Sequence, residues 1–323
     1  MSSESAPASQ GQSGNRRFAG IALRALGTLA IFAALFWKLP AADVWDAMSR
    51  TGWARWLAVM PLFALAHVVA ASKWRMLVRA AGVPLGFATA LRAHAAGLFA
   101  NIWLPSIIGG DVVRAGLVAR AHGGLAVPAI AGIADRALDL AALLTLAAFG
   151  ALLAPASALG SATPLLRGAA IALALGGAAA LAALNALDPA RLPQRLRRPA
   201  VRAREVLGAL ARQPARAATA LGASLLVQGS LVALNAWLGA AIGVAPGAAG
   251  WLLAWPLAKI VAMAPISLGG LGVRETALAS LLAPFGVPAT TAVAQGLVWQ
   301  SVLFGFGVVA GAWAWLGRRR EPQ

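Results

Sequence analysis

Two long apolar segments of the chain are interrupted by the same motif. Residues 105–114 and 265–274 both read PxxxGGxxVR, and the spacing of 160 residues recurs downstream, where Val-Pro-Ala stands at 127–129 and again at 287–289. Proline and glycine disfavour the interior of a helix, so each segment is expected to form a broken helix. The sequence therefore contains an internal repeat whose two copies share a break in an apolar run.

Composition places this repeat in a membrane. The chain of 323 residues is 60% hydrophobic and only 11% charged, whereas a soluble domain carries about 25% charged residues. The net charge of +17 would favour nucleic acid in a soluble chain. Here the arginines cluster at the ends of apolar stretches, as an orientation signal does, so no nucleic-acid partner is expected. In membrane transporters, broken apolar segments at matching positions of two halves indicate the binding site.

The sequence predicts an all-α polytopic membrane protein. Single-pass helices need about 20 apolar residues to cross ~30 Å of hydrocarbon. Six stretches come near or exceed this length, at about 19–37, 56–72, 126–153, 165–187, 217–243 and 290–316. The two interrupted segments, 87–120 and 251–283, do not fit this scheme. We predict six spanning helices plus two re-entrant hairpins of broken helices.

The distribution of arginine and lysine favours the hairpins. If segment 87–120 crossed once, the arginine-rich linker 188–216 would lie outside the cell. If it enters and leaves on the cytoplasmic side, that linker becomes cytoplasmic, as do Lys73, Arg75 and Arg79. Segment 251–283 then enters from the outer face, so the two halves form inverted-topology repeats.

This topology sets the expected organisation of the chain. Repeat one covers about 19–153 and repeat two about 165–316 of a single transmembrane domain, 19–316. A disordered tail, 1–18, and a short tail, 317–323, are both expected to be cytoplasmic, and the membrane is expected to be a bacterial inner membrane.

Ionisable residues within the apolar segments are candidates for a functional site, because an unpaired charge in hydrocarbon is costly. The four acidic candidates are accompanied by four basic residues, which predicts a balanced cluster inside the bundle. These residues are Asp111, Asp135, Asp139, Glu275, Arg114, Arg136, Lys259 and Arg274.

Asp135 and Asp139 share one face of a helix, near the expected membrane midplane. Arg136 is placed to pair with Asp139, which leaves Asp135 to meet Arg114 or Arg274.

The glycine pairs at the two breaks are candidate anion sites. The half-helices that follow Gly109-Gly110 and Gly269-Gly270 are expected to present free backbone N–H groups, with an arginine in the first turn. The guanidinium fork of arginine suits phosphate. Alternatively, the glycines are close-packing contacts, Asp111 is a helix cap, and Arg136 forms a structural ion pair with Asp139.

Metal and cofactor chemistry is not predicted. The chain has no cysteine, and its three histidines, His67, His94 and His122, lack ligand spacing. A phosphate-binding motif of the form GxxxxGK[ST] is also absent from the sequence.

The segments LPSIIGGDVVRAGLVAR, ADRALDL and APISLGGLGVRETALAS resemble the flippase-like transmembrane region of lysylphosphatidylglycerol synthases, over roughly residues 20–316. This resemblance implies lipid translocation and does not fix the lipid. The chain ends seven residues after its last predicted span, so we expect a stand-alone member without the soluble aminoacyl-transfer domain.

The leading hypothesis is a lipid flippase-like transporter, not an enzyme, whose substrate is a phospholipid or another charged-headgroup lipid. Arg114 and Arg274 would engage phosphate, and the acidic residues would engage a cationic headgroup or carry protons. One alternative is a membrane-embedded transferase with a lipid-phosphate donor, in which Asp111 or Asp135 acts as base. Another is a non-catalytic partner of a lipid-modifying enzyme.

Overall fold

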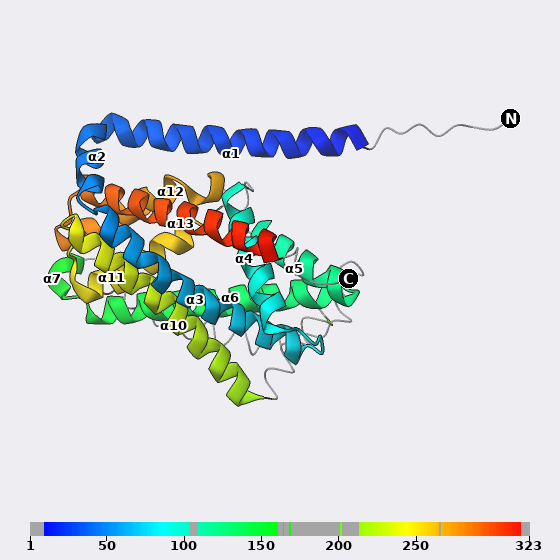
Figure 1. Cartoon of the computed structure of the whole chain (residues 1–323). Coiled ribbons are helices and arrows are strands. Elements are labelled where there is room, and N and C mark those ends of the chain that lie inside the picture. The colour runs from blue at the N-terminus through cyan, green and yellow to red at the C-terminus, as the bar shows by residue number, and fades with distance from the viewer. Residues whose placement is uncertain are drawn as a thin grey trace.

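The computed structural model describes residues 10–103, 109–160, 213–264 and 266–317, together with the isolated residues 164, 168 and 201. Every element of this part of the chain is a helix (Figure 1). The helices are α1 (Gln10–Lys38), α2 (Ala41–Ser49), α3 (Trp53–Ala80), α4 (Phe87–Trp103), α5 (Gly109–His122), α6 (Ala126–Leu153), α7 (Ala156–Leu159), α10 (Pro214–Ala241), α11 (Gly247–Val261), η3 (Leu268–Gly270), α12 (Val273–Leu282), η4 (Ala283–Phe285) and α13 (Ala289–Gly317).

Four helices are long and apolar enough to cross a membrane, namely α3, α6, α10 and α13. Helices α1 and α2 together meet the same test but are bent by 92° at the break that contains Pro40. The chain is thus a polytopic α-helical membrane protein. The predicted span at 165–187 and most of the linker 188–216 lie outside the described residues. Helix α1 includes residues 10–18, which the sequence analysis assigned to a tail.

The two interrupted segments each form a pair of short helices. Helices α4 and α5 occupy segment 87–120, and α11 and α12 occupy segment 251–283. The longest of the four has 17 residues, or about 25 Å of helix, which is shorter than the ~30 Å hydrocarbon core. The order of long helix, two short helices and long helix therefore occurs twice, as α3 to α6 and as α10 to α13.

The helix after the second break begins later in the motif than the helix after the first break. Helix α5 starts at Gly109, so both glycines of that pair are helical, whereas α12 starts at Val273 and the pair at 269–270 precedes it. Gly269, Gly270 and Gly272 have φ values of 60°, 80° and 79°, which L side chains rarely adopt. The half-helix expected to follow Gly269-Gly270 therefore begins three residues later, at Val273, because the intervening backbone is not helical.

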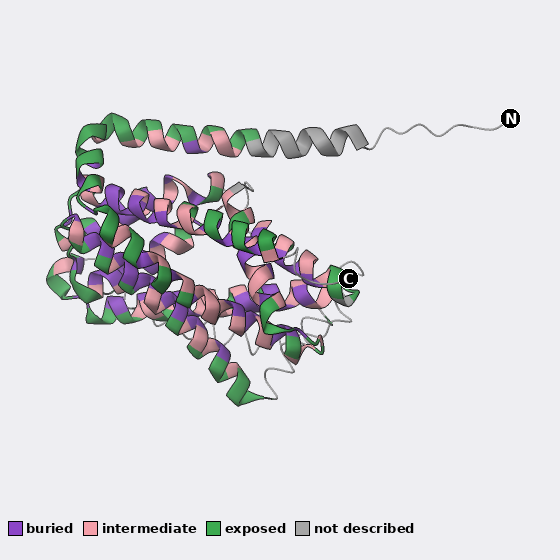
Figure 2. Cartoon of the chain, viewed as in Figure 1, coloured by how far each residue is buried: buried purple, intermediate pink, exposed green. Residues whose placement is uncertain are grey.

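Each half packs one of its short helices against a long helix of the other half. Helix α11 lies against α6, and α4 lies against α13. Small residues permit both approaches, since a Cβ added at Gly150 of α6 would meet the backbone of α11, and one added at Gly307 of α13 would meet Ile102 of α4. The buried residues concentrate in this bundle (Figure 2).

Helix α1 lies along one side of the bundle and contacts it at the second break (Figure 1). The Thr28 hydroxyl accepts a hydrogen bond of 2.8 Å from the Leu268 backbone N–H. The backbone around Gly27 approaches Ile266 closely. Leu23, Leu26 and other large apolar residues of α1 are exposed, as expected for a helix surrounded by lipid.

The crossing of α6 and α11 gives a first prediction. A Cβ at residue 150 would lie 2.7 Å from the Leu252 carbonyl carbon and 2.9 Å from the Ala249 oxygen. We expect Gly150→Ala to cost about 1–3 kcal/mol, the usual cost of overpacking, and to lower the melting temperature measured in detergent. The matched control is Gly222→Ala on α10, where no atom lies within 4 Å of the new Cβ. Equal melting temperatures for both variants would contradict this packing.

Candidate functional site

A cavity of about 390 Å³ lies between the two halves of the chain. We call it the central cavity. Its lining comes from both halves of the chain, with residues of α3, α4 and α6 on one side and of α10 to α13 on the other. Four charged residues line it, Arg136, Asp139, Lys259 and Arg274, and most of the remaining lining is apolar. A cavity with a few polar groups in an apolar wall is typical of a ligand site.

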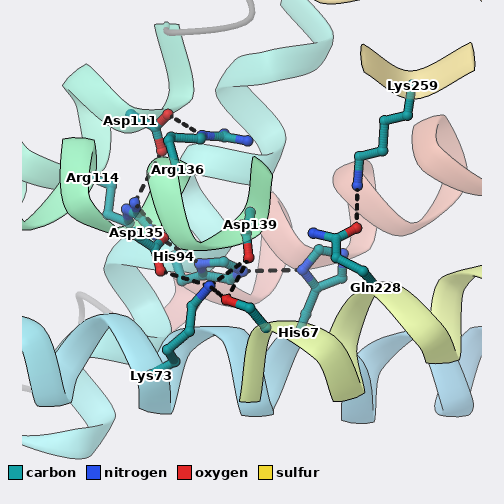
Figure 3. A network of polar contacts seen from close by, with 11 residues as sticks. His67, Lys73, His94, Asp111, Arg114, Asp135, Arg136, Asp139, Gln228 and Lys259 are labelled. Atoms are coloured by element: carbon teal, nitrogen blue, oxygen red, sulfur yellow. Dashed lines mark hydrogen bonds and ion pairs between the residues drawn. The ribbon is translucent and has the colours of Figure 1, made fainter. Parts of the chain in front are cut away.

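A network of ion pairs adjoins the cavity in the first half of the chain (Figure 3). At its centre, Lys73 Nζ lies 2.5 Å from Asp139 Oδ1 and 3.0 Å from Asp135 Oδ1. Lys73 also donates a hydrogen bond of 2.7 Å to Ser224, whose hydroxyl donates to Asp139 at 3.0 Å. Lys73 is buried, so this ammonium group joins α3, α6 and α10.

Arg114 of α5 belongs to the same network and pairs with Asp135 and Asp111. Its Nη2 atom lies 3.1 Å from Asp135 Oδ2 and 3.0 Å from Asp111 Oδ1. Its guanidinium also lies 4.4 Å from the ring centroid of Trp74, a cation–π contact. Arg114 is buried and does not line the central cavity.

Arg136 of α6 faces the cavity. Its Nε atom donates to Asp111 Oδ2 at 2.7 Å, and its side chain is 40% exposed, although it lies far from the ends of α6. The predicted pairing of Arg136 with Asp139 is therefore wrong. Asp139 is engaged by Lys73 instead, since α3 approaches α6 at that turn.

Arg274 and Glu275 form the corresponding centre in the second half. Arg274 Nη2 lies 2.5 Å from Glu275 Oε1, and it donates to Gln300 Oε1 at 2.9 Å and to the Gly296 carbonyl at 3.1 Å. Arg274 also lies 5.8 Å from the ring centroid of Trp255. Glu275 accepts a hydrogen bond of 2.7 Å from the Gly272 N–H, which caps α12.

Amide side chains occupy other polar positions of the second half. Gln295, at the position equivalent to Asp135, donates to the Asn235 carbonyl at 3.1 Å. Lys259 donates to Gln228 Oε1 at 2.8 Å. The polar groups of the second half are thus less often charged than those of the first.

The glycine pairs permit close packing in both halves, and the second pair also contributes to the cavity. Gly110 N–H donates to Asn101 Oδ1 at 2.9 Å, and a Cβ at this residue would collide with Gly97 and Asn101 of α4. Gly110 is therefore a close-packing contact between α5 and α4. In the second pair, Gly269 lines the cavity, and Gly270 packs against Ala262.

The predicted site residues are thus divided by the structure. Five of them line the central cavity: Arg136, Asp139, Lys259, Gly269 and Arg274. The carboxylates of Asp111, Asp135 and Glu275 are counter-ions to the arginines, and Arg114 lies behind the cavity wall.

Lys73 was missed because the sequence analysis placed it among the cytoplasmic orientation charges. Helix α3 continues to Ala80, beyond the predicted span end at 72. The available signal was the apolar pattern after Lys73, since Trp74, Leu77 and Val78 are also buried.

The histidines also differ from expectation. His67 and His94 were treated as scattered, yet His67 Nδ1 lies 3.0 Å from His94 Nε2 and joins α3 to α4. His94 Nδ1 lies 3.4 Å from Arg114 Nη1. Within the described part of the chain, no group of three or more metal-ligating side chains comes together.

The position of Lys73 gives a second prediction. Lys73→Met leaves two buried carboxylates without their shared cation, and breaking a buried ion pair costs about 3–5 kcal/mol. We expect a large fall in melting temperature and folded yield in detergent. The double variant Lys73→Met/Asp139→Asn removes one of those charges and should recover part of the loss.

The control is Arg50→Met, which removes an exposed ion pair with Asp46 on α2. This change should alter the free energy of unfolding by less than about 1 kcal/mol. A Lys73→Met protein as stable as the Arg50→Met protein would contradict the assignment of Lys73 as a buried counter-ion.

Comparison with known proteins places this arrangement in a family. A search of curated protein sequences finds no significant match. A family model described as the lysylphosphatidylglycerol synthase transmembrane region matches residues 19–311, which is nearly the whole chain. The chain belongs to the family of this transmembrane region.

Proposed function

We propose that the protein is a flippase-like transporter that moves a phospholipid or another charged-headgroup lipid between the leaflets of the bacterial inner membrane. The central cavity carries this proposal, because it offers charged side chains to a headgroup inside an otherwise apolar bundle. The family to which the chain belongs is also that of a lipid-related membrane region. Ionisable residues at membrane depth are expected to serve a substrate or ion pathway.

An inverted-topology repeat is part of the proposal. The helix order recurs in the two halves, and each half places its first short helix against the last long helix of the other. Inverted repeats commonly hold a substrate at their interface and move against each other. The central cavity lies at this interface, and both termini are proposed to be cytoplasmic.

The headgroup site is proposed to consist of the side chains that face the cavity. Arg136 and Arg274 come from opposite halves and both line it, so a bound phosphate would connect the halves. The carboxylates of Asp111 and Glu275 hold these arginines in place. The acyl chains would remain in lipid while the headgroup crosses, because only the headgroup needs polar partners.

Reconstitution tests this proposal directly. Purified protein in liposomes with a trace of fluorescent phospholipid should raise the fraction of label that an external reductant reaches beyond the outer-leaflet half. The lipid should be recovered without covalent change. A new lipid product in the same vesicles would instead support a transferase, and a label that stays in its leaflet would contradict transport.

Arginine variants give a third prediction. Arg136→Gln removes a cation that lines the cavity and whose side chain is 40% exposed. It should slow lipid movement about tenfold, the loss of roughly one charge-assisted hydrogen bond, and keep the folded yield. Arg114→Gln removes a buried partner of Asp135 and Asp111 and should lower the folded yield. Slowed transport in Arg114→Gln at full folded yield, with normal transport in Arg136→Gln, would contradict this division of roles.

A further inference from the structure

The interior charges of the described residues do not balance. Within that part of the chain, five cations lie in the ion-pair networks or face the central cavity, whereas four carboxylates do. The cations are Lys73, Arg114, Arg136, Lys259 and Arg274, and the carboxylates are Asp111, Asp135, Asp139 and Glu275. Because the sequence predicts four of each, the excess charge appears only once Lys73 is placed inside.

The excess charge is located at Lys259. The other four cations each lie within 3.1 Å of a carboxylate oxygen. Lys259 donates to the neutral amide of Gln228, and no carboxylate of the described residues lies within ion-pair distance of it. Figure 3 shows this ammonium group beside Gln228, apart from the main network. Lys259 lines the central cavity.

A second donor near the cavity also lacks a partner. Arg274 Nε is buried, and no described group accepts a hydrogen bond from it, although the Nη2 atom of the same side chain has three contacts. Arg274 is 7% exposed and lines the cavity. Buried donors are nearly always paired in folded proteins. The unpaired donor and the unpaired charge therefore belong to two residues that line the same cavity.

We infer that the headgroup carried in the central cavity is a monoanionic phosphodiester, with Lys259 as its principal counter-ion and Arg274 and Arg136 beside it. The inference rests on the proposed lipid transport and names its substrate class. A single negative charge neutralises the one excess positive charge at a depth where an unpaired charge is unfavourable. Phosphate oxygens also accept from both ammonium and guanidinium groups.

The same charge argument disfavours a cationic headgroup. A lysyl ester of phosphatidylglycerol carries two ammonium groups against one phosphate, so it would add positive charge to a cavity that already has an excess. A zwitterionic headgroup would leave the excess unchanged. Phosphatidylglycerol, with one phosphate and no amine, carries the single negative charge that would neutralise this excess.

The cavity wall favours a lipid over a free anion. Apolar residues such as Phe63, Leu98 and Phe304 line it together with the cations. These side chains offer no hydrogen bonds to a hydrated ion, but they suit the glycerol and upper acyl carbons of a lipid.

Lipid competition in liposomes tests the inference. Wild-type protein is reconstituted with fluorescent phosphatidylglycerol, phosphatidylethanolamine or lysyl-phosphatidylglycerol, and the rate of movement is measured for each. We expect phosphatidylglycerol to move fastest. Lys259→Gln should slow phosphatidylglycerol about tenfold with little effect on phosphatidylethanolamine, and Lys259→Arg should retain the preference. Arg50→Gln, directly after α2, should match wild type.

The outcomes separate this inference from the proposed function. If all three lipids move at equal rates, or if Lys259→Gln leaves the phosphatidylglycerol rate unchanged, transport stands and the anionic class is overturned. If no lipid moves, the proposed transport is wrong, and lipid binding then tests whether the cavity prefers an anionic headgroup. In that measurement, phosphatidylglycerol added to detergent should raise the melting temperature of wild type more than that of Lys259→Gln. Equal stabilisation by inorganic phosphate would overturn the lipid source.

Discussion

The bundle depends on the contact of one ammonium group with two carboxylates. Lys73 pairs with Asp135 and Asp139, so it joins α3 to α6, and through Ser224 it reaches α10. These groups are buried within long apolar helices, where each charge alone would cost several kcal/mol. Because every member needs its partners, the network fixes how the three helices meet. The central cavity lies next to this fixed part of the bundle.

The two halves divide their polar chemistry unequally. In the first half, carboxylates saturate the cations, and Arg114 is also covered by the ring of Trp74. In the second half, neutral amides take the place of carboxylates. Gln228 accepts from Lys259, and Gln295 donates to the Asn235 carbonyl. The first half, in which every cation of the network has a carboxylate partner, is held rigidly. The second half, in which an amide replaces a carboxylate, leaves the charge of one cation without a counter-ion. This difference is why the excess charge faces the cavity from α11.

Local pattern was sufficient to locate helices but not to pair their charges. The apolar run predicted at 126–153 coincides with α6, and the run at 290–316 lies within α13, because span length and composition act within one segment. The partner of Asp139 could not be found this way, since Lys73 is 66 residues distant in sequence. A lysine at the end of an apolar run is normally interpreted as an orientation signal. Only the three-dimensional positions of the carboxylates on other helices show that it is a buried counter-ion.

The broken helices explain why side chains, and not backbone, face the proposed ligand. The sequence predicts a phosphate site at the free N–H groups after each glycine pair, yet protein side chains accept hydrogen bonds from N–H groups at or beside both pairs. Asn101 accepts from Gly110, Thr28 from Leu268, and Glu275 from Gly272. Non-helical backbone within a membrane must be satisfied by protein or water, and here protein side chains do so. In the proposed transport site, anion recognition is therefore assigned to the side chains of Arg136, Lys259 and Arg274, which line the central cavity.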